Sequence, residues 1–294
     1  MSNLEADYKA VVSSGKTGRF LTGTSIEILQ DVTNAELPQH VLFDFDGTLS
    51  LVREGWPEVM IPMMVEILTG TGTRETLAEL HRIVEKFVME LNGKQTIYQM
   101  IHLAEEVSIR GGSPKEPLEY KRMYHDRLMA RIESRREALR SGSASPESML
   151  VPHSFDILRN LRDRGVRMYI ASGTDEAYVQ EEAELLGLKE FFGPCIYGAV
   201  DDFKSFSKAQ VITRILETNQ VDGRKLLGFG DGYVEIQNIK ERNGIAVAVA
   251  SDEAGRSGKP DAWKRKRLVG VGADIVIPDY REHAALLNHI WNAN

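Results

Sequence analysis

Two aspartates separated by one residue are the groups best suited to chemistry in this sequence of 294 residues. An apolar run from residue 41 ends at Asp44 and Asp46, and Gly47 and Thr48 follow directly. Residues i and i+2 of a strand point to the same side, so the two carboxylates face together. Gly47 permits a tight turn and close approach of a ligand to the backbone. Such a strand end suits a divalent cation and a phosphate, with one carboxylate attacking phosphorus and the other moving a proton.

Three later segments carry residue types that fit the same chemistry. Ser172 and Gly173 follow an apolar segment, where a hydroxyl and backbone N–H groups at a helix start can bind phosphate oxygens. Lys208 opens a helical segment and would place a fixed positive charge beside the phosphate, with Lys204 as the alternative donor. Taken alone, these residues also fit a helix cap and a solvated lysine.

The last of these segments pairs Asp231 with Glu235 after another apolar stretch. Oxygen ligands that leave room for water suit Mg²⁺, so this segment is a candidate part of a metal site. An isolated Gly-Asp-Gly sequence is more often a plain turn, and the functional interpretation depends on the other motifs.

The regular elements expected along the chain bring these motifs together. From residue 153 onward, apolar strands alternate with helical segments, which indicates right-handed crossovers and a parallel, Rossmann-like α/β sheet. We expect strands at 166–171, 195–197, 226–229, 245–250 and 274–277, and helices at 154–164, 176–186, 208–218 and 234–242. Ligands of such sheets bind beyond the carboxyl ends of the strands, so the four motifs are predicted to share one crevice.

The middle of the chain has a different pattern. Apolar residues recur at helical spacing over 57–68, 74–91, 96–107 and 117–139, and no good strand interrupts them. We therefore expect an all-helical insert at residues 57–149 between two parts of the α/β core, residues 39–56 and 150–294. Residues 1–38 show no clear period and are predicted to form an N-terminal extension.

In their order along the chain, these motifs resemble the haloacid dehalogenase superfamily of phosphotransfer enzymes. The shared pattern is Asp-x-Asp-Gly-Thr, strand-Ser-Gly-Thr, a helix-opening Lys and Gly-Asp-Gly-x-x-Glu. The resemblance covers residues 39–52 and 150–294, and the helical insert resembles the C1-type helical cap of that superfamily. It implies that Asp44 is the nucleophile and Asp46 the general acid/base. With Asp46 at the acid/base position, the sequence resembles the phosphatase and phosphomutase branches of the superfamily and not the dehalogenase branch. We therefore do not expect dehalogenase activity.

The same resemblance implies roles for the remaining motif residues. Ser172 and Lys208 would hold the phosphoryl group. The neighbouring turn residues are included as candidate substrate-binding positions: Gly47, Thr48 and Gly173. The Mg²⁺ ligands implied are Asp44, the Asp46 carbonyl and Asp231, with Glu235 as a further ligand. Glu235 stands where Asp is commoner, so its contact with the metal is either direct or through water.

Two basic residues are candidates for the part of the substrate beyond its phosphate. Lys94 lies in the segment 92–96, which in helical-cap relatives dips toward the site, and Arg53 follows the first motif. Either can meet a carboxylate or a second phosphate, or be solvated. The segment around Arg53 departs from the pattern of phosphoglycolate phosphatase and β-phosphoglucomutase relatives, so neither specific identity is predicted.

The sequence thus predicts a Mg²⁺-dependent phosphatase for a small phosphorylated metabolite, a sugar phosphate, acting through an aspartyl-phosphate. A phosphomutase would use the same aspartate, and a regulatory protein that binds phosphometabolites without catalysis is the third hypothesis. A mass balance separates the first two, because a phosphatase accumulates free phosphate and a mutase accumulates an isomer.

Net charge, apolar content and cysteine content indicate the expected partners and cellular location of the protein. The formal net charge of −7 gives no electrostatic reason for nucleic acid as a partner, and no stretch approaches the length needed to span a membrane. The single cysteine, Cys195, excludes an internal disulfide and suits a reducing cytoplasm. The acidic N-terminus is unlike a secretory signal, so we expect a cytoplasmic location. The basic run from Lys264 to Arg267 is expected to be a solvated helix face.

Overall fold

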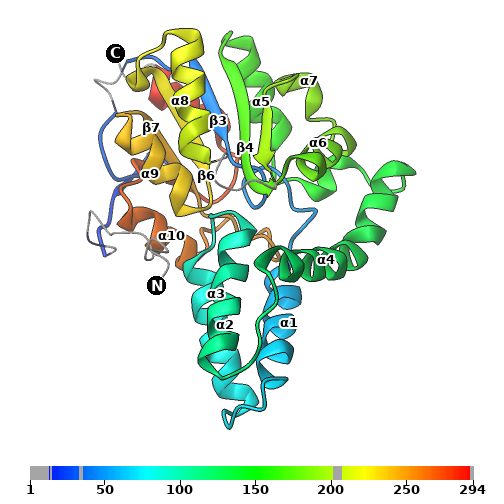
Figure 1. The fold of residues 1–294 in the computed structure, drawn as a ribbon. Helices are drawn as coiled ribbons and strands as arrows, with labels where there is room; N and C mark the ends of the chain where they lie inside the picture. The colour runs from blue at the N-terminus through cyan, green and yellow to red at the C-terminus, as the bar shows by residue number, and fades with distance from the viewer. Residues whose placement is uncertain (1–12, 14, 33–35, 201–206, 292–294) are drawn as a thin grey trace.

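One mixed sheet forms the centre of the protein (Figure 1). The computed structural model describes residues 13, 15–32, 36–200 and 207–291, and within them eight strands pair in the order β1-β2-β8-β7-β6-β3-β4-β5. The strands are β1 (Arg19–Phe20), β2 (Glu27–Ile28), β3 (His40–Phe43), β4 (Arg167–Asp175), β5 (Ile196–Ala199), β6 (Leu226–Gly230), β7 (Ile245–Val249) and β8 (Ile275–Ile277). The strands from β8 to β5 are mutually parallel, whereas β2 and β1 add an antiparallel edge.

The described residues also form eleven α-helices. They are α1 (Pro57–Thr69), α2 (Leu77–Glu90), α3 (Thr96–Ile109), α4 (Pro117–Arg140), α5 (Ser154–Asp163), α6 (Glu176–Leu185), α7 (Lys189–Phe192), α8 (Lys208–Asn219), α9 (Tyr233–Glu241), α10 (Ala262–Gly270) and α11 (His283–Trp291). Local signals explain several starts. Thr76 and Glu79 form a reciprocal capping box at α2, and the Ser207 side chain accepts a hydrogen bond from the Gln210 N–H at α8.

The central strands are apolar on both sides because helices cover both faces of the sheet. On β3, Val41 and Phe43 face a core shared with α5, α6 and α11, and Leu42 faces a second core shared with α8, α9 and α10. Phe43 stacks on Phe229 of β6 with ring centroids 4.8 Å apart. This continuous burial is what parallel sheets require, and it holds the strand ends in a fixed register.

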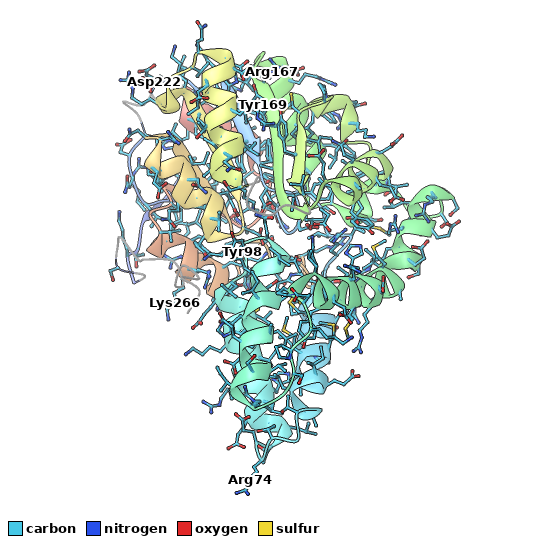
Figure 2. All side chains as sticks on the ribbon, viewed as in Figure 1. Arg74, Tyr98, Arg167, Tyr169, Asp222 and Lys266 are labelled. Atoms are coloured by element: carbon cyan, nitrogen blue, oxygen red, sulfur yellow. The ribbon has the colours of Figure 1, made fainter. Side chains whose placement is uncertain are left out.

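Helices α1 to α3 project away from the sheet as a separate lobe, and α4 runs from that lobe to lie beside α6 (Figure 1). Arg74 lies at the far tip of the lobe, whereas Tyr98 at the start of α3 lies next to the sheet domain (Figure 2). The start of α3 therefore faces the carboxyl ends of the strands.

The predicted parallel α/β sheet is present, with strands and helices close to the expected ranges. Three features differ from the expectations. Strand β4 continues to Asp175, so Ser172 and Gly173 lie within the strand and not in a turn at the start of a helix. Part of the N-terminal segment is built into the sheet as β1 and β2, which the sequence could not indicate because each strand has only two residues. The basic run is not a solvated face, since Lys264 and Arg267 are 8% and 7% exposed. No helix in the described part of the chain is long and apolar enough to cross a membrane.

Candidate active site

The site is built at the carboxyl ends of β3, β4 and β6. Phe43 lies opposite Ile170 of β4 and Phe229 of β6, so the residues that follow these three positions meet at one edge. Asp44 continues the ladder through its N–H, which donates to the Phe229 carbonyl at 2.9 Å. The register therefore brings Asp44, Ser172 and Asp231 to the same edge.

Gly47 shows why the turn after β3 needs a residue without a side chain. Its φ is +73°, a conformation that L side chains rarely adopt. A Cβ at this position would lie only 2.3 Å from Asp231 Oδ2. The turn thus packs its backbone directly against a carboxylate from β6.

A buried lysine links the first and last motifs. Lys208 Nζ lies 2.9 Å from Asp44 Oδ1 and 2.8 Å from Glu235 Oε2. Glu235 Oε1 also accepts a hydrogen bond from the Gly232 N–H at the start of α9. Burying this lysine is tolerated because two carboxylates surround its ammonium group. The alternative donor Lys204 lies outside the described residues.

Three carboxylates form a compact acidic cluster. Asp44, Asp231 and Glu235 each place an oxygen within 4.8 Å of the oxygens of the others. Burial, with Glu235 and Asp231 close by, raises the pKa of Asp44 well above its usual range, although Lys208 opposes the shift. Charged carboxylates this close repel each other unless a cation lies among them. An all-oxygen set of this kind fits a hard divalent cation such as Mg²⁺.

Asp46 sits opposite this cluster, beside residues of β4. Its Oδ2 accepts a hydrogen bond from Thr174 Oγ1 at 2.7 Å, and the Thr174 N–H donates to Ser172 Oγ at 3.1 Å. Oδ1 is buried and has no hydrogen-bond partner among the described residues. Thr174 belongs to the Ser-Gly-Thr motif, and the sequence gives no signal that its hydroxyl contacts Asp46.

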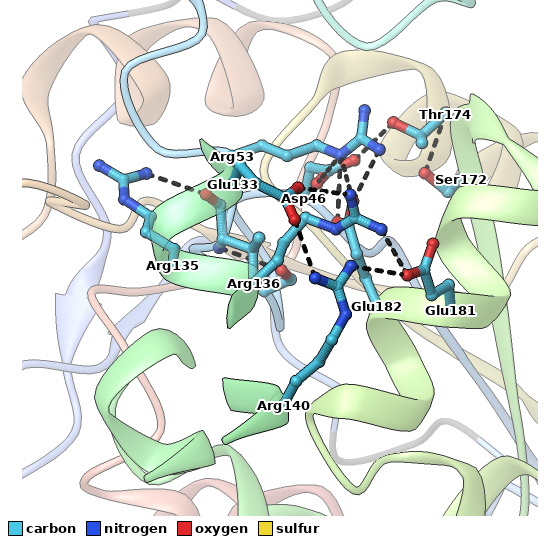
Figure 3. Close-up of polar contacts among 12 residues, drawn as sticks. Asp46, Arg53, Glu133, Arg135, Arg136, Arg140, Ser172, Thr174, Glu181 and Glu182 are labelled. Carbon is cyan, nitrogen blue, oxygen red and sulfur yellow. Dashed lines mark hydrogen bonds and ion pairs between the residues drawn. The ribbon is translucent and has the colours of Figure 1, made fainter. Parts of the chain in front are cut away.

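A buried ion pair flanks Asp46 (Figure 3). Arg53 donates from Nε and Nη2 to Glu182 of α6, at distances of 2.8 to 3.1 Å, and Glu182 is fully buried. Arg53 Nε also lies 3.8 Å from Asp46 Oδ1. Arg53 therefore lines the site with its charge already paired, an arrangement that no feature near either residue in the sequence indicates.

The surroundings of Asp46 favour its protonated form. The side chain is 28% exposed and lines the cleft together with residues of the lobe. Burial raises the pKa of Asp46 from 3.8 to about 6, while Arg53 opposes the rise and Glu182 adds to it. A carboxyl group with this pKa can hold and release a proton near neutral pH.

The helical lobe closes the site from the other side. The segment between α2 and α3 lies against the end of β4 and against the turn between β6 and α9. A Cβ on Gly173 would be 3.1 Å from the Lys94 carbonyl, and one on Gly93 would be 3.3 Å from the Gly232 Cα. Lys94 lines the cleft and its Nζ lies 5.7 Å from the centroid of the Tyr98 ring. Close approach of backbones thus explains the glycines on both sides of the cleft.

One cleft gathers most of the residues that the sequence singled out. Those lining it are Asp44, Asp46, Arg53, Lys94, Ser172, Gly173, Lys208 and Asp231. Three others are buried and do not line the cleft themselves: Gly47, Thr48 and Glu235. The cleft also contains Trp56, Gln99, Lys121, His125 and Glu253, which carried no motif in the sequence.

A lysine, a serine and several carboxylates thus meet at one edge of a parallel α/β sheet. The family model for haloacid dehalogenase-like hydrolases matches residues 38–241, and the chain belongs to this family. The predicted family and enzyme class, a hydrolase, are confirmed. No curated protein gives a significant sequence match.

Solved structures with the same fold are distant in sequence. A protein described as a predicted phosphatase from Clostridium acetobutylicum is 17% identical, with a TM-score of 0.56, covering 86% of this chain and 100% of its own. A β-phosphoglucomutase from Clostridium difficile is 12% identical, with a TM-score of 0.54 and coverage of 88% and 100%. CbbY from Rhodobacter sphaeroides, a mutant in complex with xylulose 1,5-bisphosphate, is 16% identical, with a TM-score of 0.52 and coverage of 84% and 96%.

The buried pair between Arg53 and Glu182 generates a stability prediction. Arg53→Met would leave the Glu182 carboxylate buried without its partner, so we expect the free energy of unfolding in urea to fall by about 3 to 5 kcal/mol. The double variant with Glu182→Met should recover most of this loss, since two apolar side chains remove both charges.

Arg127→Met is the matched control, because Arg127 pairs with Glu66 on the exposed surface. It should leave the urea midpoint nearly unchanged. If Arg53→Met is as harmless as this control, the pair between Arg53 and Glu182 does not stabilise the fold.

Proposed function

We propose that this protein is a Mg²⁺-dependent phosphatase that hydrolyses a small phosphorylated metabolite, a sugar phosphate, through an aspartyl-phosphate. The observation that carries the proposal is the convergence of Asp44, Asp46, Ser172 and Lys208 on one cleft. A nucleophile, a proton donor, a hydroxyl and a fixed cation are the groups that phosphoryl transfer needs.

The reaction would proceed in two steps. In the first, Asp44 Oδ attacks phosphorus, the bond between phosphorus and the ester oxygen breaks, and Asp46 gives its proton to the departing oxygen. In the second, Asp46 takes a proton from water as that water attacks the aspartyl-phosphate, which releases phosphate and restores Asp44. Lys208, 2.9 Å from Asp44, would offset the negative charge that accumulates there.

The proposed metal ligands are Asp44, Asp231 and the Asp46 carbonyl, with Glu235 nearby. When bound, Mg²⁺ supplies positive charge that draws a phosphate toward a carboxylate. Glu235 is engaged by Lys208 and by the Gly232 N–H, which favours an indirect contact with the metal over direct ligation.

Neutral polar residues support a hydroxylated substrate. Asn92, Thr96 and Gln99 line the lobe side of the cleft together with Trp56. Two of the cations that line the cleft are paired with carboxylates, since Lys121 contacts Asp175 and Arg53 contacts Glu182. A sugar phosphate with one anionic group fits this lining, and we propose that residues 57–149 act as a cap over the core formed by residues 39–56 and 150–294. The bisphosphate bound to CbbY is one related substrate class to include in a screen.

A phosphate-release screen over sugar and other metabolite phosphates, with and without Mg²⁺, tests the proposal. We expect hydrolysis of at least one sugar phosphate that requires Mg²⁺, and loss of measurable turnover in Asp44→Asn because the amide is not a nucleophile. An isomeric phosphate as product, without free phosphate, would instead identify a mutase. Unchanged turnover in Asp44→Asn would refute the assignment of the nucleophile, and inactivity of the native protein on every ester would favour a binding protein.

The pKa of Asp46 generates a pH prediction. Because the first step needs the protonated carboxyl group and this pKa is raised to about 6, kcat/KM for a sugar phosphate should decline as the pH rises through about 6. Asp46→Asn should lower kcat/KM by about 10²- to 10⁴-fold and remove this decline.

Hydrolysis of p-nitrophenyl phosphate is the control for this pH profile. Its leaving group departs without a proton, so its kcat/KM should depend much less on Asp46. A sugar-phosphate profile that keeps its decline in Asp46→Asn would show that another group titrates.

A further inference from the structure

Lys264 is a second buried lysine at the site, and it contacts Asp231, whereas Lys208 contacts Asp44 and Glu235. Lys264 lies in the first turn of α10, and its Nζ contacts Asp231 Oδ2 at 2.9 Å, Glu253 Oε1 at 2.6 Å and Ser251 Oγ at 3.0 Å. An ammonium group has three hydrogen-bond donors, so these three acceptors use its full capacity.

The contacts of Lys264 connect separate parts of the site. Ser251 Oγ donates to the carbonyl of Gly47 at 2.7 Å, in the turn that follows Asp44 and Asp46. The other oxygen of Asp231, Oδ1, accepts from Thr48 Oγ1 at 3.3 Å. Lys264 thus fixes the Asp231 carboxylate from one side while Thr48 holds it from the other.

Electrostatics gives two opposite expectations for this lysine. As a nearby positive charge, Lys264 would repel a divalent cation and weaken its binding. As a hydrogen-bond donor, it would hold Asp231 in one orientation and keep it apart from the like-charged Glu253, which strengthens binding. Outer partners of metal-ligating carboxylates commonly contribute in the second way.

We propose that Lys264 is a positioning residue that orients the Asp231 carboxylate for the divalent cation. The inference rests on the metal site of the proposed function and adds a residue outside its motifs. Contacts at 3.0 Å or less to three partners favour positioning over a purely electrostatic role, because directed hydrogen bonds fix a carboxylate in a way that a distant charge does not.

The test is a titration of metal-free protein with Mn²⁺, followed by the electron paramagnetic resonance signal of unbound Mn²⁺, in the absence of any phosphate ester. Lys264→Met should weaken the Mn²⁺ affinity about 10- to 100-fold. Lys266→Met, an exposed lysine on the same helix (Figure 2), is the matched control and should bind as tightly as the native protein.

Equal or tighter binding by Lys264→Met would overturn the proposal, since it would show that the charge of Lys264 matters more than its contacts. Ser251→Ala keeps every charge but removes one acceptor of Lys264, so it provides a second test if Lys264→Met does not fold. A smaller loss of affinity in Ser251→Ala supports positioning, and native affinity contradicts it.

Because no ester is present, failure of this inference and failure of the proposed function are distinguishable. A protein that loses Mn²⁺ affinity in Lys264→Met but hydrolyses no ester would contradict the proposed function alone. If the native protein is a Mg²⁺-dependent phosphatase and Lys264→Met binds Mn²⁺ as tightly as the native protein does, only this inference is contradicted.

Discussion

The crowding of buried negative charge at one edge of the sheet is the constraint from which the site follows. Asp44, Asp231 and Glu235 bring their oxygens within 4.8 Å of one another. Such a cluster is tolerated in a folded protein when cations oppose it or when one of the carboxylates holds a proton. Lys208 of α8 and Lys264 of α10 reach it from the same face of the sheet, each bridging two carboxylates.

The pairing register of the parallel strands determines where these charged side chains lie, and the local sequence around each residue does not. Three parallel strands end together, and the core beneath them fixes their relative height through stacked rings such as Phe43 on Phe229. The buried hydroxyl of Tyr280 donates to the Thr48 carbonyl at 2.9 Å and supports the turn from below. The lobe completes the cleft, because the segment between α2 and α3 packs against Gly173 of β4 and Gly232 at the start of α9.

Local patterns in the sequence predicted the strands β3 to β8 and most of the helices, but not the two-residue strands β1 and β2 or the helices α7 and α11. Asp44, Lys208 and Asp231 lie at strand or helix ends that hydrophobic periodicity identifies, so their convergence follows from the topology rule for parallel sheets. Glu182 and Lys264 could not be predicted in this way. Each sits in an ordinary helix, and only the packing of that helix brings its side chain to a residue that lines the cleft, Arg53 for Glu182 and Asp231 for Lys264.

Trapping the covalent intermediate tests the central claim that Asp44 is the group that attacks phosphorus. Borohydride reduces an aspartyl-phosphate to homoserine with release of phosphate, and mass spectrometry of the peptide that carries Asp44 locates the change. With Mg²⁺ and p-nitrophenyl phosphate, we predict homoserine at this position in the native protein and its absence in Lys208→Met. Turnover of the ester with Asp44 unmodified, or with a different residue reduced, would contradict the account.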